Sequence, residues 1–155
     1  MALGLEASPD LTRKEWDEYY RFSVAPTWNG PPTARQIELA EQWGLAIDAE
    51  GRRYDAFETL RDFLLCRAWV FSVIRHFARP HLPEPWRVHP FDAVHLPEMN
   101  GIASELLADI ECYRFITSAP ELDSSDQDVW FRMTKKAQKS AAFRFVAKRL
   151  VVQPP

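Results

Sequence analysis

One long apolar stretch, from Tyr54 to Arg79, constrains the fold more than any other feature of the chain. At about 100° per residue, apolar side chains surround Arg67 on one face of a helix, while Leu65 and Trp69 add apolar groups to the opposite, otherwise polar face. A helix that is apolar around most of its circumference is normally buried in a protein core. The sequence therefore predicts a central helix over residues 54–79, either fully enclosed or partly at an interface.

Capping signals mark where two shorter helices begin. Thr12 with Glu15, and Thr33 with Gln36, have the spacing of a capping box, in which two side chains each bind a backbone amide of the other residue. Gly44 suits the left-handed position that ends a helix. We therefore expect one helix to begin at Thr12 and a second, short helix to run from Thr33 to about Gly44.

Apolar periodicity predicts two more helices in the second half of the chain. One is expected from about Glu98 to Thr117 and the other from Asp126 to about Ala142. Beyond Ala142 the pattern fails, so residues 143–155 are expected to bend, to end the helix or to form an extended C-terminal tail. The sequence thus predicts a single, mostly α-helical domain over residues 1–155, a bundle of about five helices with little or no β structure.

The composition of the chain is that of an ordinary globular protein. Its 155 residues are enough to enclose one core, and 46% hydrophobic with 26% charged residues is a normal balance. The net charge of -3 argues against nucleic-acid binding by the whole surface. Any such role therefore needs a local basic patch.

The two cysteines and the N-terminal sequence indicate the cellular compartment in which the protein is expected. Cys66 and Cys112 each lie in an apolar helical pattern, which indicates reduced thiols in a core rather than a disulfide. The N-terminus has no basic segment followed by an apolar one, and no uninterrupted run of about 20 apolar residues is available to span a bilayer. We therefore expect a soluble, cytoplasmic protein with no membrane association.

Arg67 requires a partner, because a guanidinium keeps its charge among apolar neighbours. The candidate carboxylates are Glu105, Asp109 and Glu111. Two interpretations remain open. Arg67 forms a structural buried ion pair, or it lines a polar cleft and binds an anionic ligand.

All four histidines fall in one proline-rich segment, at His76, His81, His89 and His95. Histidine is a common zinc ligand, but this spacing matches no known set of metal ligands. We expect these side chains to bind loop carbonyls or water. No metal and no cofactor are predicted.

Residues 36–45 resemble the first half of a helix-turn-helix unit. The residues that carry the resemblance are Gln36, Leu39, Ala40, Gly44 and Leu45. The resemblance ends there, because Asp48, Glu50 and Gly51 follow where a recognition helix should begin, and acidic residues disfavour a DNA-facing surface. A degenerate helix-turn-helix and an ordinary helix ended by glycine are the two alternatives.

Positive charge is concentrated near the C-terminus. A basic stripe is formed by Arg132, Lys135, Lys136 and Lys139, and is continued by Arg144, Lys148 and Arg149. Such a stripe is either a solvated helix face or a contact surface for nucleic acid or an acidic protein. Because the chain carries net negative charge, a protein partner is favoured over nucleic acid.

Three tryptophans are candidate contact anchors. Trp28 and Trp86 lie in proline-bearing loops, where a large amphipathic ring either binds a partner at little cost in side-chain entropy or folds down over the core. Trp69, beside Leu65 on the polar side of the central helix, is a third anchor or a homodimer contact.

The chain carries no nucleophile elbow, glycine-rich phosphate loop or metalloprotease histidine pair. We therefore expect a non-enzymatic protein that binds macromolecules, an adaptor or a small inhibitor or regulator that occupies a protein partner's surface, as some phage- and plasmid-encoded proteins do. The alternative is a nucleic-acid-binding accessory protein that uses the basic C-terminal helix or the degenerate helix-turn-helix. A third class, a small hydrolase or ligand binder, would need a pocket that joins Arg67 to the histidine segment.

Overall fold

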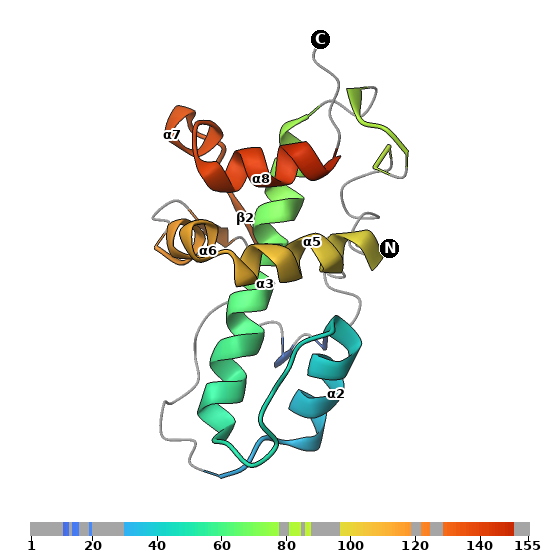
Figure 1. Ribbon diagram of the computed structural model, residues 1–155, viewed down its shortest axis with the longest axis vertical. Helices are drawn as coiled ribbons and strands as arrows, with labels where there is room; N and C mark the ends of the chain where they lie inside the picture. The colour runs from blue at the N-terminus through green and yellow to red at the C-terminus, as the bar shows by residue number, and fades with distance from the viewer. Residues whose placement is uncertain are drawn as a thin grey trace.

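A computed structural model describes residues 11, 12, 14, 15, 19, 30–77, 81–84, 86–87, 97–118, 122–124 and 129–150. Its regular elements are α2 (Ala34–Trp43), α3 (Arg53–His76), α5 (Pro97–Ala108), α6 (Ile110–Thr117), β1 (Leu122–Ser124), β2 (Val129–Phe131), α7 (Lys135–Gln138) and α8 (Ala141–Leu150). The predicted mostly helical fold is confirmed. The long helix α3 forms the axis of the molecule (Figure 1).

Helix α3 is the predicted central helix, and it is enclosed. Every residue from Phe63 to Ile74 is buried, including the polar residues Arg67 and Ser72. Twelve consecutive helical residues make about three turns, so this stretch is covered in every direction. The helix ends at His76 because Phe77, its C-cap, has extended backbone angles.

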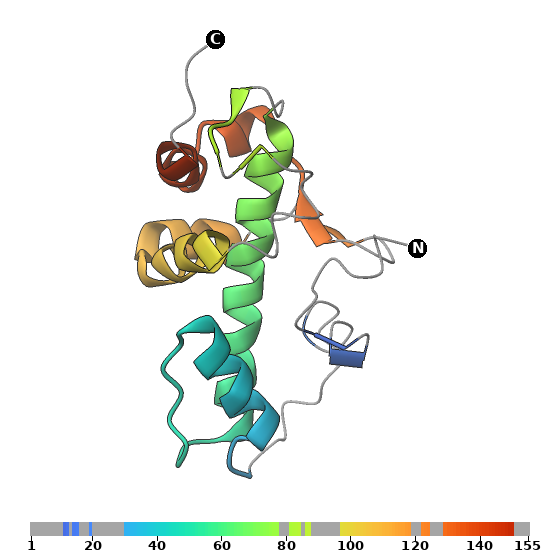
Figure 2. The ribbon, with the colours of Figure 1, turned by 90° about the vertical axis from the view of Figure 1, so that its right-hand side faces the viewer.

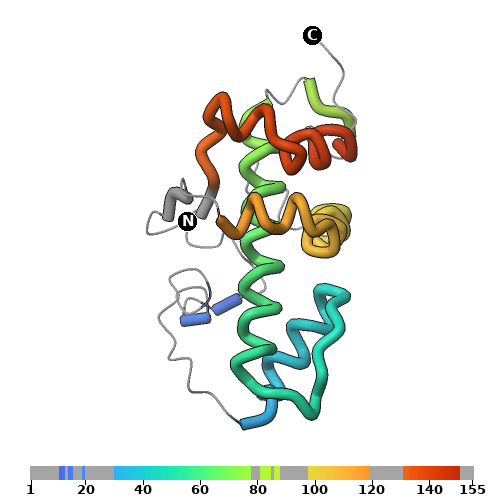
Figure 3. The backbone as a smooth tube through the Cα atoms, turned by 60° about the vertical axis from the view of Figure 1, so that its left-hand side comes forward, coloured from blue at the N-terminus to red at the C-terminus, as the bar shows by residue number. Residues whose placement is uncertain are grey.

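The elements that cover α3 lie on two sides of it. Figure 2 shows α2, α5, α6 and α8 on one side and β2 on the other. Figure 3 shows α2 beside the N-terminal half of α3, with α5 and α6 crossing its middle and α8 crossing nearer its C-terminal end. All five of these elements contact α3.

The signals at the two predicted capping boxes are confirmed. The Thr33 hydroxyl accepts a hydrogen bond from the amide of Gln36, the Gln36 side chain accepts one from the amide of Thr33, and Gly44 ends α2 in the left-handed region at φ 72°. Trp43 at the end of α2 stacks on Phe63 of α3, with ring centroids 5.0 Å apart. Local capping thus places α2 so that its apolar face packs on α3.

The N-terminal box forms in the same way. The amide of Thr12 donates to the Glu15 carboxylate at 2.9 Å, and the amide of Glu15 donates to the Thr12 hydroxyl at 3.2 Å. Glu15 also accepts a hydrogen bond from Arg35 of α2 at 2.7 Å, and Tyr19 stacks on Phe57 of α3. This segment is therefore held to both helices.

The single helix expected over residues 98–117 is instead two helices, α5 and α6. Asp109 interrupts it with extended backbone angles, φ -89° and ψ 110°, and its side chain accepts a hydrogen bond from the amide of Cys112. Asp109 is the N-cap of α6, a position that short acidic side chains favour. The apolar pattern runs through this break, which is why periodicity alone missed it.

The helix expected from Asp126 is also wrong in its first part. Strands β1 and β2 form an antiparallel pair in which Leu122 is opposite Phe131 and Ser124 is opposite Val129. Helix α7 begins only at Lys135, capped by the hydroxyl of Thr134. Residues 129–131 are branched or aromatic, as strands prefer, and the buried hydroxyl of Ser72 accepts a hydrogen bond from the Phe131 amide at 2.6 Å.

The C-terminal residues bend and then continue as a helix. Residues 143–150 belong to α8 and are not an extended tail, and Ala142, Val146 and Leu150 form its buried face. Ser140 separates α7 from α8, and its hydroxyl accepts a hydrogen bond from the amide of Phe143. The helical phase restarts after this bend, which places Lys148 on the exposed face. Within the described residues, no helix has the length and apolar character needed to cross a membrane.

Candidate functional site

The C-terminal elements carry six exposed basic residues, which we call the basic face. Its exposed residues are Arg132, Lys135, Lys136, Lys139, Arg144 and Lys148. Residues 132–150 hold seven of the 19 lysines and arginines and none of the 22 acidic residues of the chain. The remaining twelve basic and 22 acidic residues leave the rest of the molecule strongly negative. The charge of this protein is therefore sharply segregated.

Local structure turns the lysines outward. In the short helix α7, Ala137 is buried against the core, so Lys135, Lys136 and Lys139 lie on the exposed sides. The Arg144 guanidinium donates a hydrogen bond to the backbone carbonyl of Lys139, which ties α8 to the end of α7. The basic face is therefore built from two short helices joined at one bend.

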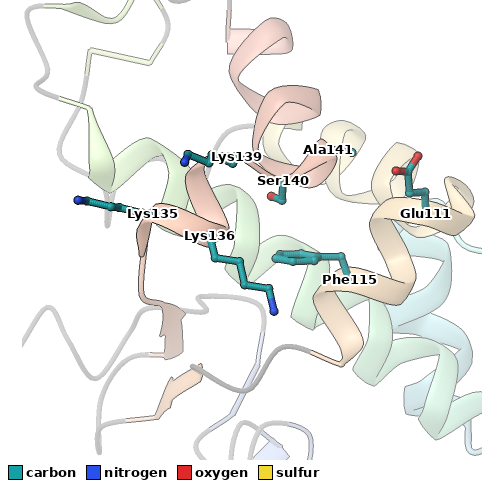
Figure 4. Close-up of a pocket in the computed structure, with 7 residues that line it drawn as sticks. All are labelled: Glu111, Phe115, Lys135, Lys136, Lys139, Ser140 and Ala141. Atoms are coloured by element: carbon teal, nitrogen blue, oxygen red, sulfur yellow. The ribbon is translucent and has the colours of Figure 1, made fainter.

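A pocket of about 570 Å³ lies between α6 and the α7–α8 bend (Figure 4). Its lining residues are Glu111, Phe115, Lys135, Lys136, Lys139, Ser140 and Ala141. Glu111 and Phe115 stand one turn apart on α6 and so share a face of that helix. The volume falls within the range of about 300–1,000 Å³ that ligand pockets occupy.

The pocket combines an aromatic surface with opposite charges at its two walls. Phe115 is half-buried, with its ring edge-on to Trp69 at 5.6 Å between centroids. Lys136 extends past the Phe115 ring in Figure 4, whereas Lys135 points away from it and Glu111 stands at the opposite wall. Within the described part of the chain, Lys135, Lys136 and Lys139 form no ion pair.

Trp69 and Trp86 are not the exposed anchors that the sequence suggested. Trp69 is only 1% exposed, and its indole N–H donates a hydrogen bond to the Ala142 carbonyl at 3.0 Å. Trp86 is also buried, and Trp28 lies outside the described residues. Leu65 is buried too, so the proposed homodimer contact through Leu65 and Trp69 has no exposed surface to use.

Trp69 was expected to be exposed because the sequence does not show that the strand pair packs against its side of α3. The side of α3 that looked polar faces β2, where Trp69 packs edge-on against Phe131 at 5.2 Å between ring centroids. Ser72, on the same helix, binds the Phe131 amide. No pattern in the sequence of α3 predicts that a strand at residues 129–131 covers this face of the helix.

Arg67 is buried, at 2% exposure, and its guanidinium lies 5.3 Å from the centre of the Trp43 ring. It therefore does not line an open cleft. Two of its three candidate carboxylates have described roles elsewhere, since Glu105 pairs with Arg149 and Asp109 caps α6. The third, Glu111, lines the pocket described above.

Two of the four histidines, His76 and His81, lie among the described residues. His76 is exposed and packs edge-on against Phe77 and Phe143, and His81 is exposed as well. His89 and His95 lie outside the described residues. Among those that are described, no group of three or more histidine, cysteine or acidic side chains could hold a metal.

The cysteines are buried free thiols, as expected. Burial raises the pKa of the Cys66 thiol, and it raises that of Cys112 to about 12, to which the hydrogen bond with Asp109 also contributes. Both thiols are therefore protonated at neutral pH. Protonated buried thiols are poor nucleophiles, so neither provides a reactive site.

The helix-turn-helix resemblance does not extend to the second helix. Helix α2 ends at Trp43, and the next helix is α3, which begins at Arg53 and supplies the core. A recognition helix contacts bases with its N-terminal residues, but the first turn of α3 exposes Asp55, whose carboxylate would repel DNA phosphates, and the helix is buried on every side from Phe63 to Ile74. The basic face and its pocket are therefore the candidate site. No family model, curated protein or solved structure gives a significant match to this chain.

Proposed function

We propose that this protein acts by binding an acidic surface of a protein partner through its basic face, as a non-enzymatic adaptor or small inhibitor. The observation that carries the proposal is the charge segregation, in which residues 132–150 contain seven basic and no acidic residues. Six of the seven are exposed. The two free, buried cysteines suit a reducing compartment, and so we place this activity in the cytoplasm.

A protein partner is favoured over nucleic acid by the shape of the site. Three lysines line one wall of a pocket that also contains the Phe115 ring and the carboxylate of Glu111. The backbone of a duplex is a convex row of phosphates that offers no apolar side chain for Phe115, and the carboxylate of Glu111 would repel those phosphates. A partner's side chain can enter the pocket while its carboxylates contact the lysines.

Nucleic-acid binding remains the second candidate function, because exposed cations in a segment without acidic residues also fit a phosphate backbone. Counterion release then predicts that the affinity for labelled duplex DNA or single-stranded RNA falls steeply as salt rises. A mobility shift of such a probe at low salt that is lost at about 0.2 M salt would favour this candidate.

The partner can be trapped by a photo-crosslinking amino acid placed at Gln138, an exposed residue of α7 between Lys136 and Lys139, followed by mass spectrometry after nuclease treatment. The matched control carries the same crosslinker at Glu41, an exposed residue of α2 outside the basic face. We expect a protein adduct that is specific to position 138. Adducts that disappear with nuclease, or equal adducts at both positions, would contradict the proposal.

Charge reversal tests the same surface without a crosslinker. The triple variant Lys135→Glu, Lys136→Glu, Lys139→Glu should abolish capture of that partner, while Lys14→Glu, another exposed lysine outside the basic face, should retain it. Circular dichroism of both variants should match the parent, because exposed charges contribute little to stability.

A further inference from the structure

We propose that the pocket between α6 and the α7–α8 bend binds a short peptide segment of the partner, in which an apolar side chain packs on Phe115 and the preceding carboxylates contact Lys136. The inference rests on the proposed function and goes beyond it by naming the element of the partner that is recognised. Its ligand class is an acidic peptide that carries one large apolar residue.

The apolar part of the inference comes from Phe115. This ring is only half-buried and faces an open pocket, so part of its apolar surface is left in water. Its position is fixed from behind, because its ring meets buried Trp69, whose own indole is hydrogen-bonded to Ala142. Because this aromatic ring is already held in place, it loses little conformational entropy when an apolar side chain binds to it.

The charged part comes from the two walls of the pocket. Lys136 supplies a cation beside Phe115 on the α7 side, and Glu111 supplies a carboxylate on the α6 side, whereas the side chain of Lys139 points away from Phe115. Acidic residues of the peptide therefore lie towards α7. On the α6 side, Glu111 repels carboxylates and favours a lysine or arginine, which sets the direction of the peptide.

The pocket and the rest of the basic face can be told apart by one pair of variants. Lys136 lines the pocket, whereas Lys148 is an exposed residue of α8 that does not. Lys136→Glu and Lys148→Glu change the net charge equally. A purely electrostatic surface would respond to both, and a peptide seated in the pocket responds mainly to the first.

The probes are two fluorescein-labelled synthetic peptides. One contains two aspartates, then a leucine, then a lysine, and the other has alanine in place of the leucine. Fluorescence anisotropy should show that the leucine peptide binds at least about tenfold more tightly. Lys136→Glu should weaken it by at least about tenfold, and Lys148→Glu by less than about threefold.

Phe115→Ala should remove the difference between the two peptides. Because Phe115 also touches Trp69, a second variant, Phe115→Leu, keeps an apolar contact at that position if the alanine variant does not fold. Glu111→Lys should strengthen binding of a peptide whose lysine is replaced by aspartate. If Glu111 had only a structural role, this variant would not change the preference between the two peptides.

Equal affinity of the two peptides, or equal losses in Lys136→Glu and Lys148→Glu, would overturn the pocket inference. If neither peptide binds while the crosslinker at Gln138 still captures a protein, the pocket inference fails and the proposed function survives. If the crosslinker at Gln138 captures no protein, yet the leucine peptide binds with the expected pattern, the pocket accepts the ligand class inferred here and the proposed function as a protein-binding adaptor is wrong.

Discussion

Trp69 and Ser72 show how single residues of α3 hold three parts of the chain together. The Trp69 indole donates to Ala142 of α8 and packs against Phe131 of β2. The Ser72 hydroxyl donates to the Ala68 carbonyl and accepts from the Phe131 amide. Because both side chains are buried, each contact joins the central helix to an element far away in the sequence.

A Trp69→Phe variant tests whether this residue is structural. It removes the hydrogen bond to Ala142 and leaves a void where the larger indole was, and we expect it to lower the free energy of unfolding by about 1–3 kcal/mol. Urea denaturation measures the change. The folded variant should still bind the partner. A variant of unchanged stability that no longer binds the partner would show that Trp69 contacts the partner directly.

At the scale of the element, α2 depends on its N-cap. The hydroxyl of Thr33 and the side chain of Gln36 satisfy two amides that the first turn of a helix leaves unpaired. Helix α2 then buries Leu39 and Trp43 on α3. Cap and packing are therefore coupled, since a frayed first turn loosens the contact with the core.

Thr33→Ala should lower the free energy of unfolding by about 0.5–2 kcal/mol, because it removes the acceptor for the Gln36 amide. Thr33→Ser keeps the hydroxyl and serves as the control. Both are compared by urea denaturation. Equal stabilities of the serine and alanine variants would show that the cap contributes nothing.

The N-terminal segment adds a pH-dependent contact between elements. The hydrogen bond from Arg35 is the main reason why the pKa of Glu15 lies below its usual 4.5. A carboxylate whose pKa is lower in the folded state stabilises the protein above the unfolded value, and this stabilisation is lost as the pH falls through the folded value.

Acidification from about pH 7 to about pH 3 should therefore destabilise the parent more than a Glu15→Gln variant, which cannot titrate. Urea denaturation at a series of pH values gives the two profiles. The two profiles should draw closer as the pH falls, because protonation of Glu15 removes the charge that the parent has and the variant lacks. Parallel profiles throughout would show that the Glu15–Arg35 contact does not contribute.

At the scale of the whole molecule, charge is divided between one end and the rest. The chain carries a net charge of -3, yet residues 132–150 hold seven basic residues and no acidic ones. Figure 1 places α7 and α8 at one end of the long axis and α2 near the other. Over distances larger than the Debye length, about 8 Å at physiological salt, each end interacts with its surroundings separately.

A cation-exchange column at about pH 7 should therefore retain this protein despite its sequence pI of about 5.8. The variant with Lys135, Lys136 and Lys139 all changed to glutamate should flow through, and Lys14→Glu should elute close to the parent. The salt concentration at elution is the measurement. Passage of the parent through the column would mean that the basic face does not act as one surface.

Some of these features are local, and the sequence determined them by itself. A cap needs only residues three positions apart, and burial of the central helix follows from apolar side chains around most of its circumference, so Thr12, Thr33, Gly44 and α3 could be predicted. The lysines of α7 are exposed because no apolar environment would accept several unpaired cations.

Other features depend on which parts of the chain meet, and only the tertiary structure decided them. The strand at 129–131 forms where Ser72 and Trp69 of α3 offer a hydrogen bond and an aromatic contact, and this strand buries the tryptophan that looked exposed. The pocket, too, exists only because α6 and the α7–α8 bend lie side by side. Burial and concavity arise between elements distant in the sequence, and no periodicity within one element encodes them.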